Sequence, residues 1–296
     1  MTHLLEHLPH LLLHTLLDTC KLLPFLFLTY LLMEYLEHKS GGKLERMLLR
    51  SNRIGPLVGG LLGVIPQCGF SAASVGLYTG RVITTGTLLA VWLSTSDEML
   101  PILISEGTSP VLILKILGFK LVAAILAGFA VDLVARALRK HNHLQTPAPQ
   151  IEDFCEREHC RCEDHFVLSA LRHTAKITLF IFLITFALNV TIEGIGEDRL
   201  AALVLDRPVI GNLLAATVGL IPNCASSVVL TELYLGGVIG VGSMLSGLLV
   251  NAGIGTALLL RNNRPVCDSL RILLLLWCLG AAVGMLVDLT PLALLF

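Results

Sequence analysis

The stretch that decides the fold is IGPLVGGLLGVIPQCGFSAASVGLYTGRVITTGTLLAVWL (residues 54–93), because a second version of it follows later in the same chain. Residues 210–249 read IGNLLAATVGLIPNCASSVVLTELYLGGVIGVGSMLSGLL, at a constant offset of 156 residues and without gaps. Both stretches carry an I-P-x-C motif, around Pro66 and Pro222. Self-similarity of this kind is the mark of an internal duplication, so we expect two homologous halves.

The composition of the chain is that of a membrane protein. Hydrophobic residues make up 54% of the 296 residues and charged residues only 15%, with a mean hydropathy of +0.79. A soluble domain carries about 25% charged residues. The net charge of −1 offers no basic face for nucleic acid. The first charged residues are Glu6 and histidines rather than Lys or Arg, so we expect no cleavable signal peptide.

Each half has the same order of apolar segments. The core segments are about 26 residues long, which is too long for one straight span and too short for two of about 20 residues. Pro66 and Pro222 break them in the middle, so we predict a hairpin of two half-helices in each; a single kinked span is the alternative. We expect these pairs of segments in chain order: about residues 22–36 and 177–192, 54–79 and 209–235, 82–104 and 238–260, and 111–138 and 270–295.

Charge placement favours the hairpins. Two hairpin legs give five passes in each half, which puts the basic runs 39–53, 136–176 and 261–271 on one side of the membrane. The acidic loop 193–206 and residues 105–107 then fall on the other side. By the positive-inside rule the basic side is cytoplasmic. Because five is odd, the second half is inverted. The prediction is an all-α polytopic membrane protein of two inverted five-segment repeats with Pro-broken hairpins, an architecture that recurs in secondary transporters.

The duplicated I-P-x-C motifs predict the main binding site. Equivalent positions of an inverted repeat face each other across the pseudo-two-fold axis, so Cys68 and Cys224 can place two thiols together at mid-membrane. Free half-helix ends also expose N–H and C=O groups that need a partner or a ligand. Thiolates suit soft ions and oxygens suit harder ones. The alternative is that each Cys is a small residue that permits close packing. The polar residues expected around the thiols are Gln67, Asn223, Ser71 and Ser227.

Adjacent carboxylates, Asp97 and Glu98, interrupt the apolar stretch LLAVWLSTSDEMLPILI. One such charge costs about 2.5–3.5 kcal/mol at the centre of a membrane helix, so a functional role is the default interpretation. The alternative is that the segment ends at the interface, for which Pro101 leaves room. The second half has no acid at the equivalent place, so we expect an asymmetric site. Asp132 and Asp288 are paired by the repeat, and helix-end contacts or an ion pair explain them as well as transport does.

Two polar tracts are secondary metal candidates, and each has a plain alternative. Four N-terminal histidines step by four, three and four residues along one helical stripe, which is either a divalent-metal site or the polar face of an interfacial helix. The central stretch DFCEREHCRCEDH is either a metal-capture tract or an exposed linker. The candidate ligands are His3, His7, His10 and His14, and Cys155, His159, Cys160, Cys162 and His165. The chain thus divides into a first transmembrane repeat with an N-terminal His-rich interfacial helix (1–138), a cytoplasmic Cys/His-rich linker (139–168) and a second transmembrane repeat (169–296).

At the paired I-P-Q-C-G-F-S and I-P-N-C-A-S-S segments the chain resembles a family of bacterial ten-pass proteins. These are described as heavy-metal exporters or arsenic efflux proteins, and in some cases as manganese transporters. The likeness covers nearly the whole chain, including the span with S-T-S-D-E and the Cys/His-rich middle loop. A more distant likeness is to permeases for organic arsenicals. The resemblance implies ion efflux at the bacterial plasma membrane.

The resulting hypothesis is a secondary transporter that exports a divalent metal or metalloid ion. The ion and the lipid bilayer are its expected partners, and a homo-oligomer is left open. Asp97 and Glu98 would bind the cation or carry coupled protons. The chain lacks GxxxxGK[ST], Ser-His-Asp and HExxH patterns, so we expect no enzyme and no permanent cofactor. The alternatives are a carrier or channel for a small organic or sulfur-containing solute, and a metal-responsive membrane sensor.

Overall fold

The computed structural model describes most of the two repeat cores and the long helices that follow them. The described residues are 54–65, 68–96, 99–141, 208–263 and 265–292, with scattered positions between 12 and 31 and between 171 and 190. Regular structure within these residues is helical throughout, and the scattered positions are helical too. The predicted all-α fold is therefore confirmed.

The helices form two sets in the same order, with four short helices followed by a long one. The first set is α3 (Gly55–Gly63), α4 (Cys68–Thr79), α5 (Thr85–Ser94), α6 (Met99–Ser105) and α7 (Pro110–His141). The second set is α11 (Pro208–Gly219), α12 (Ala225–Leu235), α13 (Val241–Val250), α14 (Gly255–Asn262) and α15 (Val266–Leu289). Every helix of the second set thus has a counterpart about 156 residues earlier.

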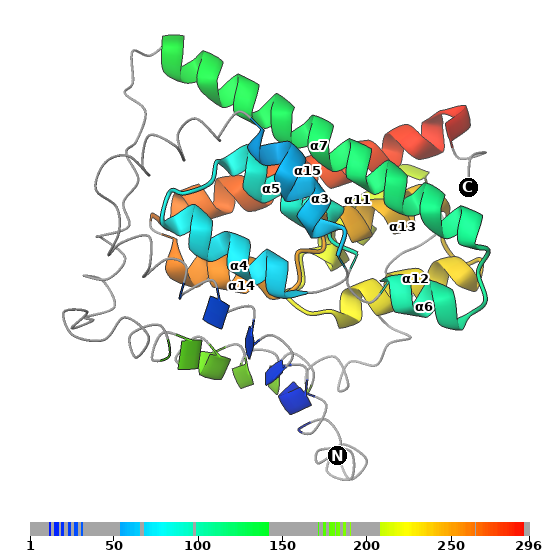
Figure 1. Cartoon of the computed structure of the whole chain (residues 1–296). Coiled ribbons are helices and arrows are strands. Elements are labelled where there is room, and N and C mark those ends of the chain that lie inside the picture. The colour runs from blue at the N-terminus through cyan, green and yellow to red at the C-terminus, as the bar shows by residue number, and fades with distance from the viewer. Residues whose placement is uncertain are drawn as a thin grey trace, which may run out of the picture.

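The long helices α7 and α15 are the more exposed of the membrane-length segments, and α7 runs along one edge of the molecule in Figure 1. Only 28% and 33% of their most apolar windows are buried, and leucines such as Leu114 and Leu289 are 72% exposed. The segments made by α5 with α6 and by α13 with α14 lie inside, 75% and 94% buried. All four segments are long and apolar enough to cross a membrane. Because an exposed apolar surface of this extent is covered by lipid rather than water, the chain is a multi-pass membrane protein.

The first leg of the first I-P-x-C segment is α3, which packs against α5. α3 follows α5 in the same direction, since Gly55 lies against Thr87 and Gly63 lies against Val91. A Cβ at Gly63 would overlap the Val91 carbonyl oxygen, so glycine is what permits this approach. α3 has nine residues. At 1.5 Å per residue it is about 14 Å long, roughly half the hydrocarbon thickness of a bilayer.

The second leg of this hairpin then returns to the side from which the first came. Near the start of α4, the indole N–H of Trp92 donates to the Ser71 carbonyl. Near its end, Tyr78 reaches Thr85 in the first turn of α5. α4 is therefore antiparallel to α5, and the hairpin re-enters instead of crossing. Two half-length legs return the chain to the side of the membrane from which it entered, as two full passes would. The assignment of loops to the two sides of the membrane, made from the sequence, is therefore unchanged.

The second hairpin repeats this packing. α11 ends at Gly219, which lies against the Gly247 carbonyl of α13, the counterpart of the Gly63–Val91 contact. α12 begins after Cys224, and its Leu230 lies against Gly247. The helix therefore ends before Pro222 and a new one starts after it. At the second motif the structure therefore has two separate short helices, one on each side of Pro222.

The next span in each half differs from the prediction. Residues 82–104 and 238–260 were each predicted as one apolar segment without a break, but each is divided into two half-helices, α5 with α6 and α13 with α14. The cause lies in short polar side chains that compete with the helix for backbone hydrogen bonds. The Thr95 hydroxyl donates to the Val91 carbonyl over 2.7 Å. The Asn251 side chain accepts from the Gly253 N–H over 3.0 Å, and Gly253 has a positive φ of 51°.

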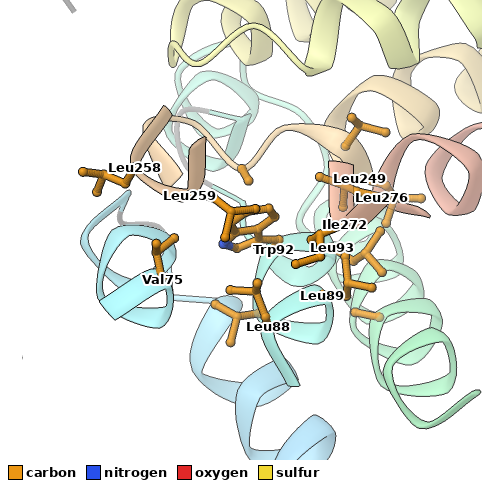
Figure 2. Packing of buried hydrophobic residues seen from close by; sticks show 14 of the residues in the cluster. Val75, Leu88, Leu89, Trp92, Leu93, Leu249, Leu258, Leu259, Ile272 and Leu276 are labelled. Atoms are coloured by element: carbon orange, nitrogen blue, oxygen red, sulfur yellow. The ribbon is translucent and has the colours of Figure 1, made fainter. Parts of the chain in front are cut away.

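The two halves share one core. α4 packs on α14, α6 packs on α12, and α5 packs on α13, so each of these contacts joins the first set to the second. Figure 2 shows Trp92 of α5 at the centre of this core, with Val75 of α4, Leu249 of α13, Leu259 and Ile272 around it. Because neither half buries this cluster alone, we infer that the halves fold as one unit.

Candidate functional site

The helix breaks of both halves meet in one region, which we call the midlayer. It comprises residues 64–65, 95–96, 220–224 and 251–254. The Ser96 hydroxyl donates to the Val64 carbonyl over 2.9 Å, so the breaks after α3 and α5 are in contact. Half-helix ends inside a membrane leave N–H and C=O groups that only side chains, water or a ligand can satisfy. The midlayer is therefore a region in which backbone groups of both halves need polar partners.

Lys120 of α7 connects the breaks of the two halves. Its side chain is fully buried, with 0% exposure. The ammonium donates to the carbonyl of Thr95, at the end of α5, and over 3.0 Å to that of Leu248, in the last turn of α13. The last carbonyls of a helix have no partner within that helix. One side chain thus satisfies a half-helix end from each half and holds the two ends together.

On the first half, the contact of α4 with α14 is built around a buried indole. The Trp92 N–H lies 3.3 Å from the Ser71 carbonyl and 3.2 Å from the Ser74 hydroxyl oxygen. Ser71 is fully buried, and its backbone passes so close to Gly255 that a Cβ there would lie 3.2 Å from the Ser71 carbonyl oxygen. This fixes the start of α4, which follows the first I-P-x-C motif, against the start of α14.

On the second half, the start of α12 is closed by local hydrogen bonds. The Asn223 side chain accepts from the Ala225 N–H over 3.2 Å. The Ser226 hydroxyl donates to the Asn223 carbonyl over 2.8 Å, and the Ser227 hydroxyl donates to the Cys224 carbonyl over 2.7 Å. Asn223 and Ser227 are buried, whereas Cys224 is half-buried. The hydroxyl and amide oxygens retain lone pairs, so this corner can offer oxygen ligands and one thiol to an ion.

Asp132 and Asp288 lie away from the midlayer, at the other ends of α5 and α13. Asp132 accepts from the Gly86 N–H over 2.9 Å and from the Thr84 hydroxyl over 2.7 Å. Asp288 accepts from the Gly242 N–H over 3.0 Å and from the Asn212 amide over 2.8 Å. A carboxylate at a helix N-terminus satisfies free N–H groups and is favoured by the helix dipole. Of the explanations that the sequence left open for this pair, the structure selects helix-end contacts.

The predicted ligands are only partly placed. The start of α12 brings together Asn223, Cys224 and Ser227. Ser71 lies elsewhere, in contact with Trp92 and with the start of α14. Among the described residues, no three His, Cys, Asp or Glu side chains are grouped as a metal site. The pairing of two thiols therefore stays a prediction. The candidates outside the described residues are Gln67, Asp97, Glu98, the Cys68 side chain, His3, His7, His10, His14, Cys155, His159, Cys160, Cys162 and His165.

Lys120 is the functional candidate that the sequence reasoning missed. It is one of two lysines in the apolar segment 111–138, which was predicted as an ordinary span. The available signal was that an ionisable residue inside a membrane helix is costly and usually functional. A second signal was asymmetry, because the position 156 residues later is Leu276. Asn251 was not proposed as a site residue, since the break it caps was not expected.

Comparison with known proteins places the chain in a family. Residues 11–198 match the family model described as "Putative, 10TM heavy-metal exporter". The match covers more than half of the chain, including the first hairpin, both half-helices after it and the central linker, so the chain belongs to this family. No curated protein and no solved structure matches the chain. Membership in an exporter family indicates a metal ion as substrate and transport rather than catalysis as the activity.

Proposed function

We propose that this chain is a secondary transporter that exports a divalent metal or metalloid ion across the bacterial plasma membrane, with a binding site formed by the midlayer and the residues that flank it in the chain. Family membership supports the class of activity. The observation that carries the location is that half-helix ends of both halves converge on Lys120 in a fully buried position. Broken helices at mid-membrane provide the carbonyl and N–H groups with which secondary transporters hold ions.

The proposed architecture is an inverted repeat. The first half crosses the membrane with its first span, with α5–α6 and with α7, while the α3–α4 hairpin returns to its own side. Three crossings are an odd number, so the second half begins on the opposite side and runs through the membrane inverted. The basic runs then place the central linker in the cytoplasm. Counting the hairpin legs separately, each half has five segments and the chain has ten, in keeping with the family description.

The proposed ligands come from both halves. Cys68 and Cys224 supply thiols, and Asp97 and Glu98 stand in the sequence between the end of α5 and the start of α6. Asn223, Ser71 and Ser227, with Gln67, complete the set. A hard ion such as Mn²⁺ prefers carboxylate and carbonyl oxygens, whereas arsenite or another soft ion prefers thiolates. The two substrate classes therefore predict different residues as essential.

The test is metal flux into inside-out or reconstituted vesicles with Cys68→Ser, Cys224→Ser and Asp97→Asn. For a soft ion, each Cys variant should lower transport at limiting substrate by about tenfold or more, and for Mn²⁺ the loss should fall on Asp97→Asn. Matched controls are Cys278→Ser, an exposed thiol on α15, and Glu106→Gln, an exposed carboxylate after α6. Unchanged flux in all three site variants would show that the midlayer assignment is wrong.

A further inference from the structure

Lys120 has a stronger electrostatic setting than its two hydrogen bonds alone convey. It lies in the middle of α7, ten residues after the helix begins at Pro110, and none of its surface is exposed. An ammonium in this position is costly unless negative charge faces it. The carbonyls that it contacts, of Thr95 and Leu248, close the C-terminal ends of α5 and α13.

Those helix ends supply compensating charge. The C-terminus of a helix carries a partial negative charge of about −0.5, concentrated on its free carbonyls. Two such ends facing one ammonium therefore both favour its positive charge. Leu249 and Trp92 are fully buried near these ends, together with the polar side chains of Thr95, Ser96 and Asn251. The setting is thus that of a binding position for a small monovalent cation, lined by backbone carbonyls from both halves.

This position is not duplicated. The residue 156 positions after Lys120 is Leu276, which is also fully buried, so the repeat fills the equivalent space with an uncharged side chain. Lys115, on the same helix, has an exposed side chain and a basic counterpart in Arg271. The ammonium at position 120 is therefore a feature of the first half alone, as are the carboxylates that follow Thr95.

We propose that the contact of α5 with α13 forms a binding position for a primary ammonium ion, which the chain fills with its own Lys120. The lysine acts as a positioning residue: its tethered charge holds the C-terminal ends of two half-helices, one from each half, in one place. When the tether is removed, the empty position will accept a free alkylammonium ion. This inference rests on the carbonyl geometry and not on the identity of the exported ion, so it can fail or hold independently of the proposed transport.

The test is thermal unfolding of the purified full chain in detergent, with Lys120→Ala. Propylammonium has the three carbons and the nitrogen that this substitution removes. We expect the Tm of Lys120→Ala to lie below that of the wild type and to rise by about 3 °C or more in propylammonium chloride relative to choline chloride. Choline carries the same charge in a bulkier form, and propanol has a similar shape without the charge. Neither should restore the Tm.

Leu276→Ala is the matched control, because it removes a buried side chain from the equivalent position of the other half. Its Tm should fall without a specific response to propylammonium, and Lys120→Arg should retain stability without added ion. An equal response of Lys120→Ala to propylammonium and propanol would mean that only a cavity is being filled, which overturns the proposal. So would the same response in Leu276→Ala.

Folding itself provides a second measurement. If Lys120→Ala yields no folded protein in ordinary buffer, the variant is expressed and purified in propylammonium chloride, in parallel with Lys120→Met. Recovery of folded Lys120→Ala only with propylammonium supports the proposal. Absence of folded Lys120→Ala with and without the ion, while Lys120→Met folds without it, shows that the side chain's bulk matters and not its charge, and overturns the proposal.

Discussion

The half-helices α5 and α13 are alike at their N-terminal ends and differ at their C-terminal ends. Their starts are alike, since each has a Gly N–H bound to an aspartate of the long helix behind it, Asp132 or Asp288. Their ends are unlike, since Thr95 follows the end of α5 and Asn251 follows the end of α13, and a lysine from the first half donates to a carbonyl at each of these ends. The duplicated end is the scaffold that sets the angle of the helices. The end that departs from the repeat is where an asymmetric ion site can arise.

The largest effect should come from crowding the duplicated end. A Cβ at Gly86 would overlap both the Asp132 carboxylate and the backbone carbonyl of Gly128 in α7. At Gly242 the nearest atoms all belong to the Asp288 carboxylate, a side chain that can rotate. We expect Gly86→Ala to destabilise the protein by about 3 kcal/mol or more, or to abolish its folding, and Gly242→Ala by about 1–2 kcal/mol. Thermal unfolding of both variants checks the order; equal losses would contradict the backbone clash.

A smaller loss should follow from removing the carboxylates themselves. Asp132 is 4% exposed, whereas Asp288 is only half-buried. Asp132→Ala leaves the Gly86 N–H without its acceptor in a buried place, at a cost of about 1–3 kcal/mol. Asp288→Ala should cost less, because water can reach its donors. Thermal unfolding of the two single variants and of the double variant measures this. A larger loss for Asp288→Ala would show that burial does not set the cost.

The sequence allowed the hairpins to be predicted but not the second set of breaks. Pro66 and Pro222 interrupt apolar runs whose length fits neither one span nor two, and the half-helices end beside them. The run that contains Thr95 has ordinary span length, and its break depends on a hydroxyl bonding back to its own helix and on Ser96 reaching Val64. Contacts of that kind depend on tertiary structure, which a pattern of apolar residues does not encode.

The sequence pointed to the duplicated motif and to Asp97 and Glu98, but not to Lys120. Asn223 and Ser227 were proposed because they flank a duplicated motif. Lys120 was missed because its partners are backbone carbonyls, which every residue has and which no sequence motif marks. Asymmetry between halves was used for Asp97 and Glu98 but was not applied along α7. A comparison of ionisable residues at all positions 156 apart would have identified the lysine.

The smallest expected effect concerns a contact between the halves that the repeat does not duplicate. The Tyr78 hydroxyl of α4 donates to Asp268, in the first turn of α15, over 3.0 Å. Asp268 also accepts from the Asn263 amide over 2.9 Å. Tyr234, the counterpart of Tyr78, packs instead in an apolar cluster that includes Leu112. Leu112 is the counterpart of Asp268 in the other half. The polar contact therefore exists at only one end of the molecule.

Tyr78→Phe should destabilise the protein by about 1–2 kcal/mol, because it removes one hydrogen bond to a charged acceptor. Tyr234→Phe should change the stability by less than about 0.5 kcal/mol, because no hydrogen bond of its hydroxyl is found within the described residues. Thermal unfolding of both variants under one set of conditions provides the comparison. Adding Asp268→Asn to Tyr78→Phe should cost less than the two changes separately, since both act on one contact. Full additivity would instead mean that Tyr78 stabilises the protein through packing alone, and that α4 is not tied to α15 by this hydrogen bond.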